Sequence, residues 1–326
     1  MKRNLTAVAL GLFFAAGVVA QATAQVKWTM PTPYADASFH SVNNKQFAEE
    51  VRKESGGKLD ITVHTGASLM KLPEIKRAVQ LGQVQIGETL MSSMANDDAI
   101  FEATNVPFLA KGFDKAEVLW AMIKDQVAER LQKQGLVLLY AAPWPSQGIY
   151  SKEPLKEIGD LKGSKMRTYD RATARFAELL GATPVTVQAA DVPQAFATGM
   201  INSLITSATT GVDTKAWEYV NNFYDFKAMI ARNAVIVNAK SFAALDPATQ
   251  KTLLEAGRRA EARATKVAME LEEKQKAVLK ERGVNVHTPS TAIAANMDKI
   301  GETLTTEWAQ RAGVNGTDIL KKLRSN

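Results

Sequence analysis

Short apolar runs alternate with helical patterns along the chain, and this alternation restricts the fold more than any other feature of the sequence. In the first half, the runs Val26–Met30, Leu59–His64 and Val84–Leu90 predict strands. Helical patterns over about Val42–Glu54 and Pro73–Leu81 separate these strands. Since a β-α-β-α-β order is typical of parallel sheets covered by helices, we expect an α/β fold with a parallel sheet.

A second set of the same kind follows in the middle of the chain. A helix predicted at Lys115–Lys133 leads to a strand at Val137–Ala142. Further strands are predicted at Lys165–Thr168, Pro184–Val187 and Ile201–Thr206, with helices at Thr173–Leu180 and Asp191–Thr198 between them. Two α/β units in a chain of this length predict two lobes. Ligands of open α/β sheets bind at the carboxyl ends of strands, so the crevice between the lobes is the expected site.

One long helix is predicted near the C-terminus. Pro247 follows Asp246 and fits a first helical turn, and Gly283 fits the stop. Apolar or small residues recur every three or four positions from Leu253 to Val278. An unbroken helix would be roughly 50 Å long, at about 1.5 Å per residue, and could cross both lobes. The alternative is a pair of helices with a kink near Gly257.

The N-terminal residues have the features of a signal peptide. Lys2 and Arg3 precede an uncharged apolar run, Leu5–Ala20, and Ala22–Ala24 is an A-x-A cleavage site. We expect residues 1–24 to be a signal peptide that is cleaved after Ala24, which places the mature protein in the periplasm. A membrane anchor is the alternative, but a spanning helix needs about 20 apolar residues.

Composition argues against several classes of protein. The sequence has no cysteine, which excludes disulfides, thiolate metal sites and a lipoprotein anchor. Its three histidines have no local partner motif, and neither G-x-S-x-G nor H-E-x-x-H occurs. We therefore expect no enzymatic activity, metal or cofactor. The 40 basic residues are mixed with 34 acidic ones, so nucleic-acid binding is not expected, although a net charge of +6 favours anionic ligands.

Several segments, in their order and spacing, resemble the solute-binding subunits of TRAP transporters, the DctP family. They are Glu74 with Val79–Ile86, Asn105–Phe108, Lys152–Pro154 with Asp160–Arg167, Gly181–Pro184, Asp191–Phe196 and Gly199–Asn202. The resemblance covers nearly all of the chain after the signal peptide. It implies a type II periplasmic-binding-protein fold, with two hinged lobes and a long C-terminal helix that spans both.

The resemblance also implies domain boundaries and partners. Lobe I is expected to comprise residues 25–145 and about 232–275, and lobe II about 146–231 and 276–326. Such a receptor closes on a small organic acid and delivers it to the small and large membrane permease subunits, which a sodium gradient drives. We expect it to work as a monomer. The alternatives are an ABC-type or a sensor-linked periplasmic binding protein with the same fold.

The resemblance assigns the main ligand contact to Arg167. In the family, the arginine of this segment forms a bidentate salt bridge with the ligand carboxylate, a pairing for which the guanidinium fork is suited. A second family arginine aligns with Gln147, and a ligand-contacting asparagine aligns with Thr206. Because both replacements are uncharged, we expect a monocarboxylate whose remainder is neutral, hydroxylated or aromatic, and not a dicarboxylate.

Further candidates lie in segments that are expected to border the cleft. They are His40 after the first strand, Ser92 and Ser93 after the third, Trp144 near Gln147, Tyr169 and Asp170 after Arg167, and Trp217 on the helix after the binding strand. Other roles are open for some of these residues. Trp144 and Trp217 could belong to the core, Asp170 could cap a helix, and His40 could start one.

Overall fold

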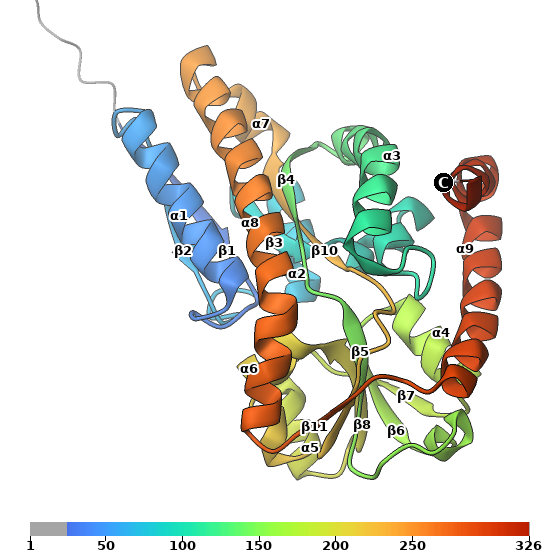
Figure 1. Ribbon diagram of the computed structural model, residues 1–326. Coiled ribbons are helices and arrows are strands. Elements are labelled where there is room, and N and C mark those ends of the chain that lie inside the picture. Colours follow the sequence, from blue (N-terminus) through green and yellow to red (C-terminus); the bar gives the residue numbers. More distant parts are fainter. Residues whose placement is uncertain (1–24, 326) are drawn as a thin grey trace, which may run out of the picture.

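The computed structural model describes residues 25–325, so the predicted signal peptide lies outside the described residues. Figure 1 shows two layered α/β units joined by a long helix. The first unit begins with β1 (Val26–Pro31), α1 (Phe39–Glu54), β2 (Leu59–His64), α2 (Leu72–Gln80) and β3 (Ile86–Leu90), followed by η2 (Ala99–Asn105), α3 (Gly112–Lys133) and β4 (Leu136–Pro143). Each of these strands and α helices corresponds to a predicted element, with ends that differ by a few residues.

The second unit holds a six-stranded sheet. Its elements are β5 (Gln147–Ser151), β6 (Lys165–Thr168), α4 (Arg171–Leu179), β7 (Thr183–Thr186), α5 (Val192–Ala197), β8 (Ser203–Ser207), α6 (Ala208–Asp213) and β9 (Asn222–Tyr224). The chain then forms β10 (Arg232–Asn238), α7 (Ala239–Ala243), α8 (Pro247–Glu281), β11 (Asn285–His287) and α9 (Thr291–Ser325). The strand order in the larger sheet is β11-β9-β5-β8-β6-β7.

The expected parallel pairing is correct for part of the structure only. β1 and β2 are parallel, and so are the pairs β6–β7 and β6–β8. β10 lies between β3 and β4 and is antiparallel to both, while β5 is antiparallel to β8. All residues of β10 are buried. Its sequence therefore lacks the alternation of apolar and polar residues that marks a half-exposed strand.

The chain passes between the units more than once. β4 leads into β5, and β9 leads into β10, so neighbouring strands of the two sheets are covalently linked at the centre of the molecule. α8 contacts α1 and β4 at one end and α6 and β11 at the other. These connections place the carboxyl ends of β6 and β8 opposite the loops of the first unit.

α8 is one continuous helix, so the alternative of a kink near Gly257 is wrong. Small buried residues, among them Ala256, Gly257, Ala260 and Ala264, form the face that contacts the first unit. A Cβ atom at Gly257 would lie 2.9 Å from the carbonyl oxygen of Leu139 in β4. Glycine at this position therefore allows the close approach of α8 and β4.

α9 contacts both units. It packs against α4 on one side and against α3 and η2 on the other, and its path changes at Gly313, where φ is 64°. The expected lobe boundaries remain a proposal, and α9 shows that residues 276–326 do not contact the second unit alone. Between residues 25 and 325, no helix has the length and apolar character needed to cross a membrane.

Candidate ligand-binding site

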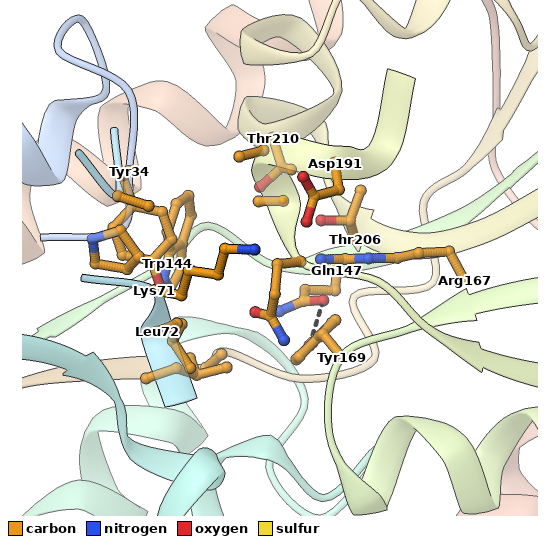
Figure 2. A pocket seen from close by; sticks show the side chains of 17 residues that line it. Tyr34, Lys71, Leu72, Trp144, Gln147, Arg167, Tyr169, Asp191, Thr206 and Thr210 are labelled. Atoms are coloured by element: carbon orange, nitrogen blue, oxygen red, sulfur yellow. Dashed lines mark hydrogen bonds between the residues drawn. The ribbon is translucent and has the colours of Figure 1, made fainter. Parts of the chain in front are cut away.

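A small cavity lies between the two units, at the carboxyl ends of β6 and β8 (Figure 2). The first unit contributes Tyr34, Leu72, Leu90 and Trp144, and the second contributes Gln147, Arg167, Tyr169, Thr206 and Thr210. Its volume is about 100 Å³. Since a site for a drug-sized ligand is about 300 Å³ or more, this cavity fits a compact molecule.

Arg167 is the buried cation of this cavity. It projects from β6 with a relative exposure of 3 %. Its Nε donates to the carbonyl of Val187 at 2.8 Å, and Nη1 donates to that of Ile205 at 3.3 Å. No carboxylate of residues 25–325 forms an ion pair with it. Burial lowers the pKa of Arg167, although Tyr169 and Asp170 act in the opposite direction. A buried guanidinium that forms no ion pair favours an incoming anion.

Uncharged polar groups of the second unit lie around the guanidinium, and the carboxylate of Asp191 lines the same cavity. The Tyr169 ring lies beneath it, 4.7 Å from Cζ to the ring centroid. The Tyr169 hydroxyl donates to Oε1 of Gln147 at 2.7 Å. Thr206 lies on β8, and Thr210 lies in the first turn of α6. The sequence prediction that Gln147, Thr206 and Tyr169 lie near Arg167 agrees with this arrangement, and their contact with a ligand remains a proposal.

The opposite wall of the cavity is aromatic, and the polar groups of its rings point to the buried side-chain amide of Asn233. The Tyr34 hydroxyl and Nε1 of Trp144 both donate to Oδ1 of Asn233, at 3.0 Å each. The Tyr34 and Trp144 rings meet edge to face, with centroids 5.0 Å apart. Trp144 therefore presents the carbon atoms of its ring to the cavity, because its N–H already donates a hydrogen bond to Asn233.

Glu88 anchors this wall from behind. Its carboxylate is fully buried and accepts from Asn233 Nδ2 at 2.8 Å and Asn44 Nδ2 at 2.7 Å, and also from the Thr32 hydroxyl. Burial raises the pKa of Glu88, but the hydrogen bonds and the attraction of His40 outweigh it, so that the pKa lies below its ordinary value. The ionised Glu88 therefore fixes the positions of the three side chains that donate hydrogen bonds to it.

His40 does not line the cavity, so the structure gives no support to its expected ligand contact. The ring lies behind Trp144, with centroids 4.3 Å apart, and is 1 % exposed. Its Nδ1 is 3.3 Å from Oε1 of Glu88. His40 belongs to the buried polar cluster that supports the wall, because α1 turns it inward.

Asp170, Ser92 and Ser93 border a second hollow next to the cavity, not the cavity itself. Asp170 caps α4, and its Oδ1 accepts from the backbone N–H and the hydroxyl of Thr173. Its Oδ2 accepts from Asn105 Nδ2. Both oxygens are occupied by the protein, so the capping role describes Asp170 better than a ligand contact.

Trp217 is also away from the cavity. It lies in η5 (Ala216–Glu218), is partly buried against the core of the second unit, and has the guanidinium of Arg282 5.3 Å above its ring. Trp217 therefore packs against the core, which is the alternative role that the sequence left open.

A family model for bacterial extracellular solute-binding proteins, family 7 (DctP), matches residues 33–311. The chain belongs to this family. Family 7 proteins and the structural neighbours of this chain are solute-binding receptors and not enzymes. The predicted α/β periplasmic-binding-protein fold with a long C-terminal helix is confirmed.

Solved structures of family 7 receptors are similar to this one over almost the whole chain. Two extracytoplasmic solute receptors of Bordetella pertussis have 43% and 41% identity, each with a TM-score of 0.90, and cover 92% of this chain and 100% and 99% of their own. A TRAP solute-binding protein from a marine metagenome has 38% identity and a TM-score of 0.90, over 93% of this chain and 99% of its own. All three bind pyroglutamate.

The match to a further relative covers a smaller part of both chains. A solute-binding protein of Verminephrobacter eiseniae is 32% identical over 175 residues. This match covers 52% of the chain and 51% of the relative, so the chain spans about half the length of that relative.

Sequence reasoning missed several residues that line the cavity of this family 7 protein, among them the polar residues Tyr34, Lys71, Asp191 and Thr210. Tyr34 lies in the loop after β1, close in sequence to His40, for which the sequence predicts a ligand contact; Tyr34 lines the cavity and His40 does not. Lys71 precedes α2 and reaches toward the middle of the cavity (Figure 2). A lysine before a helix start is a common surface feature and gave no signal of this position.

Proposed function

We propose that this protein is the extracytoplasmic receptor of a TRAP transporter and that its ligand is pyroglutamate. Arg167 carries the proposal, because it is a buried cation that forms no ion pair with the described residues, in a cavity between two units. Burying an unpaired charge costs free energy, which a ligand carboxylate recovers through two parallel hydrogen bonds.

The size and polarity of the cavity support pyroglutamate. This molecule has one carboxylate and a neutral five-membered lactam, which corresponds to the expected monocarboxylate with a neutral remainder. The ring needs a compact site with an apolar wall, and Leu72, Leu90 and Trp144 offer one. Three receptors with 38% to 43% identity bind the same compound.

The partners follow from family membership. We propose that the protein, exported and cleaved after Ala24, works as a monomer in the periplasm, with lobes bounded near residues 146, 232 and 276. Closure of these lobes on the ligand then presents the complex to the small and large permease subunits. In this account the closed state is favoured only by contacts that the ligand makes with both units.

A thermal-shift screen of organic acids tests the ligand. Pyroglutamate at 100 times its Kd should stabilise the protein by about 2.7 kcal/mol, and proline, succinate and a uronate at the same concentration should stabilise it less. A larger shift with succinate or the uronate would show that the ligand is another acid. No shift with any carboxylate would contradict the proposed function as a whole.

A further inference from the structure

The hydrogen-bond direction at Tyr34 is fixed by groups behind the cavity wall. Two independent constraints act on the side-chain amide of Asn233. The indole N–H of Trp144 can only donate, so the atom of Asn233 that faces it at 3.0 Å must be the oxygen. Glu88 is fully buried and, when ionised, can only accept, so the atom of Asn233 that faces it at 2.8 Å must be the nitrogen.

Both constraints give the same amide orientation, and this determines the role of Tyr34. Its hydroxyl lies 3.0 Å from Oδ1 of Asn233, an acceptor, so the single phenolic proton is donated to that oxygen. What remains on the Tyr34 oxygen is lone pairs. Tyr34 can therefore accept a hydrogen bond from a ligand but has no proton to donate to one.

Tyr34 is placed to use this property. It lines the same cavity as Arg167, and the positive charge of Arg167 acts on the Tyr34 phenol. Burial raises the pKa of Tyr34 well above its ordinary value, so the phenol stays protonated at neutral pH. The oxygen of Tyr34 is thus a neutral acceptor in the wall of the first unit, in the cavity that Arg167 also lines.

We propose that Tyr34 determines specificity by accepting a hydrogen bond from an N–H group of the ligand, and that Asn233, held by Glu88, is the positioning residue that keeps Tyr34 an acceptor. The inference rests on the proposed function and deepens it, because it identifies the lactam N–H as a group that the receptor recognises. A buried acceptor that faces a ligand without a donor loses its partner, which weakens binding.

Isothermal titration with two analogues of pyroglutamate tests this inference. 3-Oxocyclopentanecarboxylate keeps the carboxylate, the ring and the carbonyl and has CH₂ in place of N–H. 5-Oxotetrahydrofuran-2-carboxylate has a ring oxygen there, which brings an acceptor toward an acceptor. We expect the first to bind at least about tenfold more weakly than pyroglutamate, and the second more weakly still.

Variants assign the effect to Tyr34. In Tyr34→Phe the ratio of the two Kd values, carbocycle over pyroglutamate, should fall to near one, because the acceptor is gone and Asn233 is still held by Trp144 and Glu88. Tyr140→Phe is the matched control. Tyr140 is also buried and donates, at 2.6 Å, to Asn44, another amide bound to Glu88, but it does not line the cavity. Its loss should leave the ratio unchanged.

Asn233→Leu tests the positioning role. Without the amide oxygen, the phenolic proton of Tyr34 is free to turn to the ligand, so the lactone should gain affinity relative to pyroglutamate. A purely structural role would weaken both ligands equally. If this variant does not fold, the wild-type and Tyr34→Phe titrations still decide the acceptor role.

The outcomes separate the two proposals. Equal affinities of the wild type for pyroglutamate and the carbocycle, or an unchanged ratio in Tyr34→Phe, would overturn the inference and leave the receptor function standing. A wild type that binds neither compound would instead contradict the proposed ligand.

Discussion

Two buried charges on opposite sides of the cavity are held in different ways. Glu88 is surrounded by donors from Thr32, Asn44 and Asn233, so its charge is satisfied within the protein. Arg167 has only two backbone carbonyls as acceptors. Glu88 therefore orders the side chains of the wall, and Arg167 can form an ion pair with a ligand.

The ionised Glu88 should contribute to stability in a pH-dependent way. Its folded-state pKa is lowered, so its contribution is present above its unfolded pKa of about 4.5 and is lost as the pH falls through the lower folded value. Glu88→Gln places an amide N–H₂ among donors and should lower the free energy of unfolding by about 1–3 kcal/mol at pH 7.

Urea denaturation at pH 7 and at several values below pH 4.5 measures this effect. The difference between wild type and Glu88→Gln should narrow as the pH falls. Glu129→Gln, which changes an exposed carboxylate, is the control and should match the wild type. A difference that stays constant through the acid range would mean that Glu88 is not ionised in the folded protein.

For single residues, the sequence predicts the positions of those that lie in local motifs better than of those that lie in hydrogen-bond networks between distant segments. Arg167 lies in a family motif and within a predicted strand, so its position was predictable. The wall formed by Tyr34, Trp144 and Asn233 joins three distant segments, and no local pattern links them. The same argument applies to His40, for which the sequence predicts a ligand contact and which lies behind the wall.

Among the secondary-structure elements, the predicted ones have local signals and the missed ones do not. β2 and β6 have the expected bounds, since apolar residues alternate along β2 at Leu59, Ile61 and Val63, and β6 lies between the turn at Gly163 and the helix cap Asp170. β5 begins at Gln147 and β10 at Arg232, and both strands are completely buried in spite of these polar residues. Their identity as strands depends on neighbouring strands, which a single sequence does not show.

Gly148 in β5 shows how closely two strands approach below the cavity. A Cβ atom there would lie 2.2 Å from the carbonyl oxygen of Tyr224 in β9 and 2.7 Å from the ring of Phe223. Gly148→Ala should therefore lower the free energy of unfolding by about 1–3 kcal/mol through overpacking. Since Gly148 follows Gln147, ligand affinity should fall as well.

Denaturant unfolding compares Gly148→Ala with Gly159→Ala. The nearest atom to a Cβ at Gly159 belongs to the flexible side chain of Glu157, at 3.2 Å, so this variant should stay within about 0.5 kcal/mol of the wild type. Equal stability of the two variants would show that β5 and β9 can move apart without cost.

The whole molecule combines linked strands with one long helix. The β4–β5 and β9–β10 connections cross between the units, and α8 lies along both. A relative motion of the units therefore bends several segments at once, which suits a limited closure and not a free rotation.

We predict that pyroglutamate makes the molecule more compact. Small-angle scattering should show a smaller radius of gyration with ligand than without, because contacts to Arg167 and to the first-unit wall are made together only in the closed state. Arg167→Ala should show no change on addition of the acid. An unchanged radius for the wild type at saturating ligand would argue against closure.

The most direct test of the central claim is a titration of pyroglutamate into wild type, Arg167→Ala and Arg167→Lys, with Arg232→Lys as the control. Arg232 is as buried as Arg167 but pairs with Glu117, outside the cavity. We expect Arg167→Ala to weaken binding by at least about 30-fold, Arg167→Lys to weaken it less, and Arg232→Lys to bind like the wild type. A folded Arg167→Ala that binds pyroglutamate as tightly as the wild type would contradict the account.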